Sequence, residues 1–325
     1  MEFTDKLNIY RDKINDSLDQ VLQVQEPKLL YEPMKYIIEI GGKRIRPILC
    51  EIFYRMFNGE KDKVLYPALA IELLHNFTLV HDDIMDDDDK RRNKPTVHVK
   101  WDLAVGVLAG DGVVSLAYKV LLKEKFNSSD KIINIFTEGL LEVCEGQGFD
   151  KEFETRADVT EEEYVNMIDK KTSALLAVST KIGAACADVD NELLEIASQY
   201  GRALGLAFQI QDDYLDIAGD EKLLGKTYGS DVQKGKKTYL YIKAKEKLTG
   251  EDLNKFNEII EKEDVTREEI LTVRDIYERN GILDDTNDEI VRRIELAKVA
   301  IEKLSRSYDT QELIEFTEYM LNRKF

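Results

Sequence analysis

Proline is scarce in this sequence and unevenly distributed along it. Only five prolines occur in 325 residues, and none follows Pro95. A proline inside a helix costs about 3 kcal/mol, so the long proline-free remainder is compatible with continuous helices. That remainder is rich in Leu, Ala, Glu, Lys and Ile, and it shows neither an internal repeat nor a low-complexity linker. We therefore predict an all-α protein with a single domain over residues 1–325.

Cysteines and long apolar stretches are also rare. Cys50, Cys144 and Cys186 lie far apart without a CxxC pair, which disfavours both a disulfide scaffold and a zinc site. No apolar run approaches the roughly 20 residues of a membrane span. The N-terminus lacks the basic flank and apolar segment of a signal peptide. We expect a cytoplasmic protein with reduced, buried thiols and no stable membrane anchor.

Positive charge is in deficit. The chain has 46 Lys and Arg residues against 64 Asp and Glu residues, which gives a formal net charge of −18. A protein that binds nucleic acid is expected to have a basic face, so nucleic acid is not an expected partner. An acidic chain that binds an anionic substrate must gather its basic groups locally or recruit metal ions.

Apolar periodicity predicts where the principal helices lie. Residues 66–85 place apolar side chains at steps of three and four, which indicates an amphipathic helix. Residues 192–217 are apolar around more than one face, which is typical of a buried, central helix. Thr160 and Glu163 have the spacing of a capping box that opens a further helix.

An acidic cluster, Asp82-Asp83-Ile84-Met85-Asp86, ends the first of these helices. Residues four apart share a helix face, and stacked carboxylates repel by a few tenths of a kcal/mol unless a cation intervenes. Magnesium typically takes one or two carboxylates together with substrate phosphates. The spacing of an EF-hand is absent. On this cluster alone, a magnesium site and a solvated acidic helix end both remain open.

A second cluster, Asp212-Asp213-Tyr214-Leu215-Asp216, repeats the same spacing after the predicted buried helix. Charge at the end of a core helix is costly unless it is compensated. The repeat favours a functional interpretation, in which the two clusters lie on facing helices with metal ions and an anionic substrate between them.

Basic residues occur where phosphate groups would need them. Three cations follow a glycine pair in residues 41–47, Gly-Gly-Lys-Arg-Ile-Arg-Pro, and two arginines follow the first acidic cluster. Arginine offers phosphate a bidentate fork and lysine a point charge. The spacing of a P-loop is absent, which argues against ATP chemistry. Each basic group taken singly also fits a solvated surface residue.

Five segments in this order resemble the trans-type isoprenyl diphosphate synthases, the polyprenyl synthetase family. The matching segments are 41–47, 72–75, 79–86 with Arg91-Arg92, Lys171-Thr172, and 208–216 with Gly225-Lys226 and Gly229-Ser230-Asp231. Two residues depart from the family pattern: Asn93 stands where glycine is usual, and Lys90 where an apolar residue is common. Both departures bear on the shape of a loop.

The resemblance implies a bundle of long helices around a central active-site cavity, assembled as a homodimer. It also implies a reaction in which an allylic diphosphate ionises with the help of magnesium, at three ions per site. Isopentenyl diphosphate then attacks the allylic cation, and a proton leaves. The expected partners are isopentenyl diphosphate and the allylic dimethylallyl, geranyl and farnesyl diphosphates.

The resemblance also assigns roles to residues of this chain. The expected magnesium ligands are Asp82, Asp86 and Asp212, supported by Asp83 and Asp216. The residues expected to hold the allylic diphosphate are Arg91, Lys171, Lys226 and Lys236. Those expected to hold isopentenyl diphosphate are Lys43, Arg46, His75 and Arg92. The groups expected to steady the cation are the Lys171 carbonyl, Thr172 and Gln209.

Product length is expected to depend on Phe77 and Thr78, which precede the first acidic cluster. Phenylalanine blocks a growing chain and threonine leaves room. This resembles archaeal short-chain synthases that make C20 geranylgeranyl diphosphate, with C15 farnesyl diphosphate as an additional product.

Two alternative functions are weighed against this one. A type I terpene cyclase shares the first acidic cluster but needs no second diphosphate site, and the cations at Lys43, Arg46 and Arg92 argue against it. A non-catalytic subunit of a heteromeric synthase tends to lose metal ligands, whereas both clusters are intact here.

Overall fold

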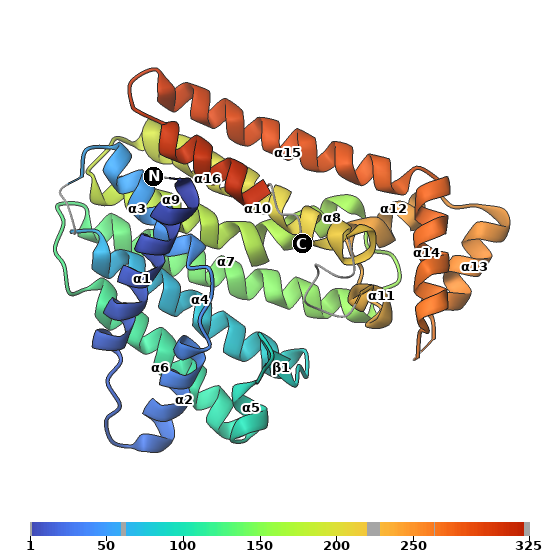
Figure 1. Cartoon of the computed structure of the whole chain (residues 1–325), viewed down its shortest axis with the longest axis horizontal. Helices are drawn as coiled ribbons and strands as arrows, with labels where there is room; N and C mark the ends of the chain where they lie inside the picture. The colour runs from blue at the N-terminus through green and yellow to red at the C-terminus, as the bar shows by residue number, and fades with distance from the viewer. Residues whose placement is uncertain (1, 60–62, 220–227, 263, 322–325) are drawn as a thin grey trace. The chain divides into compact units, whose positions relative to one another are not determined.

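The computed structural model describes residues 2–59, 63–219, 228–262 and 264–321. Figure 1 traces the chain from its blue N-terminus to its red C-terminus. The first elements are α1 Phe3–Val21, α2 Lys28–Glu39, α3 Ile45–Met56, α4 Leu65–Met85, β1 Lys90–Arg91, β2 Lys94–Pro95, α5 Val97–Lys100, α6 Leu103–Leu121 and α7 Ser129–Thr155. The remaining helices are α8 Glu161–Ile168, a π-helix Asp169–Ser173, α9 Ala174–Cys186, α10 Asn191–Ala218, α11 Ser230–Gln233, α12 Tyr239–Lys247, α13 Gly250–Ile260, α14 Arg267–Arg279, α15 Ile282–Ser305 and α16 Gln311–Leu321.

Helices dominate the described residues, as the sequence predicts. The predicted helices at 66–85 and 192–217 are confirmed as α4 and α10. The capping box is also confirmed, because the Thr160 hydroxyl accepts from the Glu163 amide and the Glu163 carboxylate accepts from the Thr160 amide. The strands of the described residues form one short antiparallel pair. The fold class is therefore all-α.

The residues group by their contacts into two compact units, each described by itself. Unit 1 comprises Met1–Leu140, Leu175–Ser198 and Leu304–Glu315. Unit 2 comprises Leu141–Ala174, Gln199–Lys303 and Phe316–Phe325. Neither unit is one continuous segment of the chain, and the single-domain expectation remains a prediction.

In unit 1, α4 packs along α6, and α2 and α3 flank the pair (Figure 1). The sequence prediction about apolar stretches needs a correction here. By length and composition, α6 is apolar enough to cross a membrane, and it is the one such helix in the described chain. One face of α6 is buried in unit 1 through Val105, Ala109, Val113 and Ala117. Gly110 of α6 allows the close approach of α4, because a Cβ there would overlap the His81 ring.

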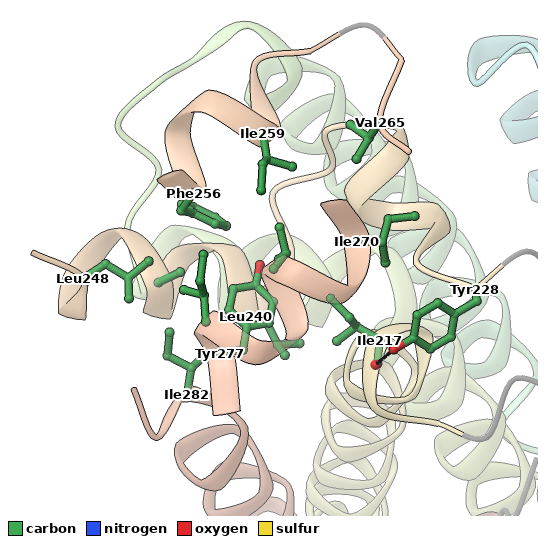
Figure 2. Close-up of a cluster of buried hydrophobic side chains, with 13 residues drawn as sticks. Ile217, Tyr228, Leu240, Leu248, Phe256, Ile259, Val265, Ile270, Tyr277 and Ile282 are labelled. Carbon is green, nitrogen blue, oxygen red and sulfur yellow. Dashed lines mark hydrogen bonds between the residues drawn. The ribbon is translucent and has the colours of Figure 1, made fainter. Parts of the chain in front are cut away.

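Unit 2 has an apolar core of its own, which joins α10 to α12, α13 and α14 (Figure 2). Phe256 of α13 and Ile276 of α14 are fully buried in it. Tyr228 also lies in this cluster and donates from its hydroxyl to the Ile217 carbonyl at 2.6 Å. This bond fixes residue 228 against the end of α10, directly after the second acidic cluster.

Candidate active site

The first acidic cluster lies at the C-terminal end of α4. Asp83 is 1% exposed, and its Oδ1 accepts from Arg91 Nε at 2.7 Å and also from Nη2. Burial raises the pKa of Asp83, and the Arg91 guanidinium opposes that shift. Asp82 and Asp86 are more accessible, because a step of one residue turns Asp83 by about 100° towards the core. The structure therefore joins two predicted site residues, Asp83 and Arg91, in one ion pair.

A tight hairpin after this cluster determines where the Arg92 side chain lies. Lys90 pairs with Pro95, and Arg91 with Lys94, so the turn consists of Arg92 and Asn93. Both turn residues have positive φ, 51° and 62°, as a type I′ turn requires. Asparagine tolerates this conformation, which explains how Asn93 replaces the glycine usual in the family.

The Arg92 guanidinium lies against the glycine pair between α2 and α3. A Cβ on Gly42 would lie 2.8 Å from Arg92 Nη2, and Gly42 has a φ of +150°. The backbone conformation favours glycine at this position, and the missing side chain leaves room for the Arg92 guanidinium. Arg92 thus lies beside Gly42, the residue that precedes Lys43, its expected partner in binding a diphosphate.

Arg46 and His75 also meet in this region. Arg46 Nη1 lies 3.1 Å from His75 Nε2, and arginine only donates, so Nε2 accepts. Burial lowers the pKa of His75 well below its usual value, and the nearby arginines, first Arg46 and then Arg92, lower it further. His75 is therefore neutral near pH 7, with its proton on Nδ1. Unit 1 thus brings together Arg46, His75 and Arg92, three residues that the resemblance assigns to one diphosphate.

Arg44, between these predicted ligands, has a different role. It is 3% exposed and donates from Nη1 to the Glu72 carboxylate at 2.6 Å. Its other donors bind the Ile38 carbonyl at 2.8 Å and Asn15 Oδ1 at 2.9 Å. Its donors face the protein interior, so Arg44 organises the loop instead of binding a ligand.

The second acidic cluster borders a cavity of about 170 Å³ in unit 2. Five predicted site residues line it: Lys171, Thr172, Gln209, Asp212 and Lys236. Thr172 Oγ1 donates to Gln209 Oε1 at 2.9 Å. The structure therefore brings lysines, a carboxylate and two oxygen dipoles to one cavity.

The other two carboxylates of the second cluster bind the protein itself. Asp213 accepts from the Tyr164 hydroxyl, the Tyr239 amide and the Gln209 side chain. Burial raises the pKa of Asp213 to about 7, the Asp231 carboxylate adds to the rise, and these three hydrogen bonds oppose it.

Asp216 does not line the cavity. It accepts from the Ser230 hydroxyl at 2.8 Å and the Asp231 amide at 3.0 Å, one on each oxygen. These bonds hold the segment that starts α11. A metal ion would have to use the lone pairs that remain on the two oxygens, so a ligand role for Asp216 stays a prediction.

Lys171 and Thr172 lie in a π-helical turn, Asp169–Ser173, in which the Ala174 amide bonds to the Asp169 carbonyl. Such turns often mark functional sites, because they displace the backbone from α-helical register. A Cβ on Gly146 of α7 would overlap the Lys171 backbone, and a Cβ on Gly205 of α10 would overlap Ser173. These two glycines therefore allow α7 and α10 to pack closely against the π-turn that contains Lys171 and Thr172.

The structure reveals lining residues that sequence reasoning missed. Asp150 forms an ion pair with Lys171, and the Tyr164 hydroxyl donates a hydrogen bond to Asp213 in the cavity wall. The sequence has only an indirect signal for Asp150: Gly146, about one helical turn earlier, marks the close approach of α7 to the Lys171 backbone. Tyr164 offers no such signal, because buried tyrosines are common in helical cores.

The other predicted site residues are more peripheral or lie outside the description. Lys226 falls outside the described residues. Phe77 packs edge to face on His81, with ring centroids 4.8 Å apart. The Thr78 hydroxyl donates to the His75 carbonyl at 2.8 Å, within its own helix. Both chain-length candidates are half-buried on α4, and their role stays a prediction.

The carboxylates of the two acidic clusters fit a magnesium ion that is bound by both the protein and a phosphate group. Asp83 Oδ2 is a buried acceptor without a hydrogen-bond partner among the described residues. In that part of the chain, no three His, Cys, Asp or Glu side chains come together as a metal cage. Magnesium needs no such cage, because it typically takes one or two carboxylates and completes its shell with phosphate oxygens and water.

Comparisons with known proteins agree with this fold. The model of the polyprenyl synthetase family matches residues 27–278. Geranylgeranyl diphosphate synthase of Methanosarcina mazei is 38% identical over all of this chain and 99% of its own length. A crystal structure of a geranylgeranyl pyrophosphate synthase has a TM-score of 0.92 and 38% identity, and it covers 98% of this chain and 99% of that one.

A fourth similarity includes a bound ligand. A polyprenyl synthase from Caulobacter crescentus, solved with calcium and isoprenyl diphosphate, has a TM-score of 0.87 and 26% identity over 99% of this chain and 97% of that one. These similarities define an all-helical synthase. The chain belongs to the polyprenyl synthetase family.

The buried ion pair gives a test of which cations are structural. Replacing Arg44 with Met should lower the free energy of unfolding by about 3–5 kcal/mol, because Glu72 keeps a buried charge without its partner. Replacing exposed Lys43 with Met should change stability by less than about 0.5 kcal/mol and weaken binding of inorganic diphosphate. Urea unfolding and calorimetry measure the two effects.

The double replacement of Arg44 and Glu72 by Met removes both buried charges and serves as the control for the unpaired Glu72 carboxylate. It should recover most of the stability, because no charge remains buried. Equal stability losses in the Arg44 and Lys43 variants would contradict the structural role of Arg44.

Proposed function

We propose that this enzyme is a short-chain trans-prenyltransferase that makes geranylgeranyl diphosphate. It condenses isopentenyl diphosphate with dimethylallyl, geranyl or farnesyl diphosphate. Family membership and the full-length similarity to geranylgeranyl diphosphate synthases support the reaction and its main product. Farnesyl diphosphate as an additional product is part of the proposal.

The single observation that carries the proposal is the cavity of unit 2. It combines Lys171, Lys236 and Asp212 with the oxygen dipoles of Thr172 and Gln209. The lysines bind the allylic diphosphate and neutralise its negative charge as it leaves, and the oxygens face the positive charge that develops on the allyl group. Asp82, Asp86 and Asp212 would hold the metal ions that neutralise this diphosphate.

Magnesium is the proposed metal, with three ions per site. When bound, it neutralises the diphosphate and makes it a better leaving group. The side chains that would hold it are Asp82, Asp86 and Asp212, supported by Asp83 and Asp216. The calcium in the Caulobacter crescentus structure supports a divalent cation in this family.

The arginine cluster of unit 1 is the proposed site for isopentenyl diphosphate. Arg46 and Arg92 supply planar guanidinium groups, Lys43 adds a point charge, and neutral His75 orients Arg46. The released diphosphate accepts the proton that leaves in the last step. A type I terpene cyclase would not need this second anion site, and a non-catalytic subunit would not need intact carboxylates in both clusters.

The proposal includes a single functional domain and a cytoplasmic homodimer. Leu103, Val107 and Leu108 on α6 are 60%, 42% and 50% exposed, which supports a partner surface on this apolar helix. Surface apolar side chains that cluster on one element often mark protein contacts.

Elongation by the purified protein tests the reaction. With magnesium, labelled isopentenyl diphosphate and each allylic starter in turn, we expect C20 product, and none after chelation of magnesium. Replacing Asp82 or Asp212 with Asn should lower kcat by about 100-fold or more, since each variant loses a carboxylate that would hold the magnesium needed to neutralise the leaving diphosphate. Turnover of an allylic diphosphate without isopentenyl diphosphate would support a cyclase, and no elongation with any starter would support the non-catalytic alternative.

Product length tests the role of Phe77. A Phe77→Ala replacement removes a ring from α4 and should shift the products beyond C20. A Phe77→Leu replacement keeps most of the volume and should leave the distribution near that of the parent. Chromatography of the dephosphorylated products measures the shift. An unchanged distribution in Phe77→Ala would exclude Phe77 as the residue that stops elongation.

A further inference from the structure

A chain of hydrogen bonds in unit 2 leads from a buried tyrosine to the cavity. The Tyr164 hydroxyl and the Tyr239 amide both donate to Asp213 Oδ2, the latter at 3.1 Å. Gln209 Nε2 donates to Asp213 Oδ1 at 3.1 Å. Thr172 Oγ1 then donates to Gln209 Oε1 at 2.9 Å. Only the last two residues belong to the groups expected to face the allylic cation.

The direction of every bond in this chain follows from Asp213. An ionised carboxylate only accepts, so Gln209 must turn its amide nitrogen towards Asp213. The amide oxygen of Gln209 then faces Thr172, and the Thr172 hydroxyl must donate its proton to that oxygen. Thr172 and Gln209 both line the cavity. Because the Thr172 proton is used in this bond, the lone pairs of its hydroxyl oxygen face the cavity.

We propose that Asp213 is a positioning residue that sets the polarity of the cavity wall. Held by Tyr164 and the Tyr239 amide, it orients Gln209, and Gln209 directs the negative end of the Thr172 hydroxyl dipole towards the allylic cation. The reverse orientation would point the Thr172 proton at the cation and oppose ionisation. This inference rests on the proposed function, because it concerns the allylic cation of that reaction.

Replacing Asp213 with Asn should reverse the direction of these hydrogen bonds while the side chains keep nearly the same shape. Two donors, Tyr164 and the Tyr239 amide, meet at the Oδ2 position, so the oxygen of the introduced amide takes that place. The nitrogen of the introduced amide then faces Gln209, which turns over and directs its own nitrogen to Thr172. The Thr172 proton is left to face the cavity.

Steady-state kinetics at pH 8 tests the proposal. Asp213→Asn should lower kcat for elongation of farnesyl diphosphate by about 100-fold, and change KM for both substrates by less than about 3-fold. The unfolding temperature should stay within a few degrees of the parent value. Asp252→Asn, an acid-to-amide change in unit 2 outside the cavity, is the matched control and should leave kcat unchanged.

A second replacement restores the original polarity. In Asp213→Asn combined with Gln209→Glu, the carboxylate introduced at position 209 accepts from both the amide introduced at position 213 and the Thr172 hydroxyl. The net charge equals that of the parent. This double variant should regain at least about 10-fold in kcat over the single Asp213→Asn variant. A purely structural role for Asp213 predicts no such rescue.

A double-mutant comparison covers the case in which Asp213→Asn does not fold. Gln209→Leu and Thr172→Val should each lower kcat, and together they should lower it hardly further, because they break the same chain. Independent losses, an unchanged kcat in a folded Asp213→Asn protein, or absence of rescue would overturn the inference. Absence of elongation by the parent protein would instead overturn the proposed function.

Discussion

The placement of this site depends on how buried negative charge is compensated. A carboxylate removed from water is costly unless cations or hydrogen-bond donors surround it. In both acidic clusters the second aspartate is buried: Asp83 is held by Arg91, and Asp213 by Tyr164, Tyr239 and Gln209. The first aspartate of each cluster, Asp82 or Asp212, is half-exposed. One motif thus serves two purposes, since one carboxylate organises its neighbours and another remains accessible to a ligand.

The same principle governs the cations. Arg44 neutralises Glu72 inside unit 1, whereas Arg46 and Arg92 surround a neutral histidine. A neutral His75 accepts from Arg46 and adds no charge to the cluster. Positive charge concentrated in this way gives a protein of formal net charge −18 a local site for an anion.

Much of the fold and part of the site follow from the sequence alone. Apolar periodicity gives α4 and α10, and the capping box gives the start of α8, because these signals are local. The i, i+1, i+4 spacing predicts which aspartates share a helix face. The sequence does not reveal that Arg44 is buried, that Lys171 lies in a π-turn, or that Tyr164 bonds to Asp213. Each of these depends on contacts between residues distant in sequence, such as Gly146 against Lys171. Apolar helix α6 is a further case, because composition alone does not reveal that α4 covers one of its faces.

The central claim is that the two acidic clusters bind one diphosphate. A crystal structure with magnesium, isopentenyl diphosphate and an unreactive thio analogue of farnesyl diphosphate tests it most directly. We expect metal ions that link a single diphosphate to Asp82 and Asp86 on one side and to Asp212 on the other, with Asp83 and Asp213 still bonded to Arg91 and Gln209. A diphosphate bound to one cluster alone, with no metal at the other, would contradict the claim.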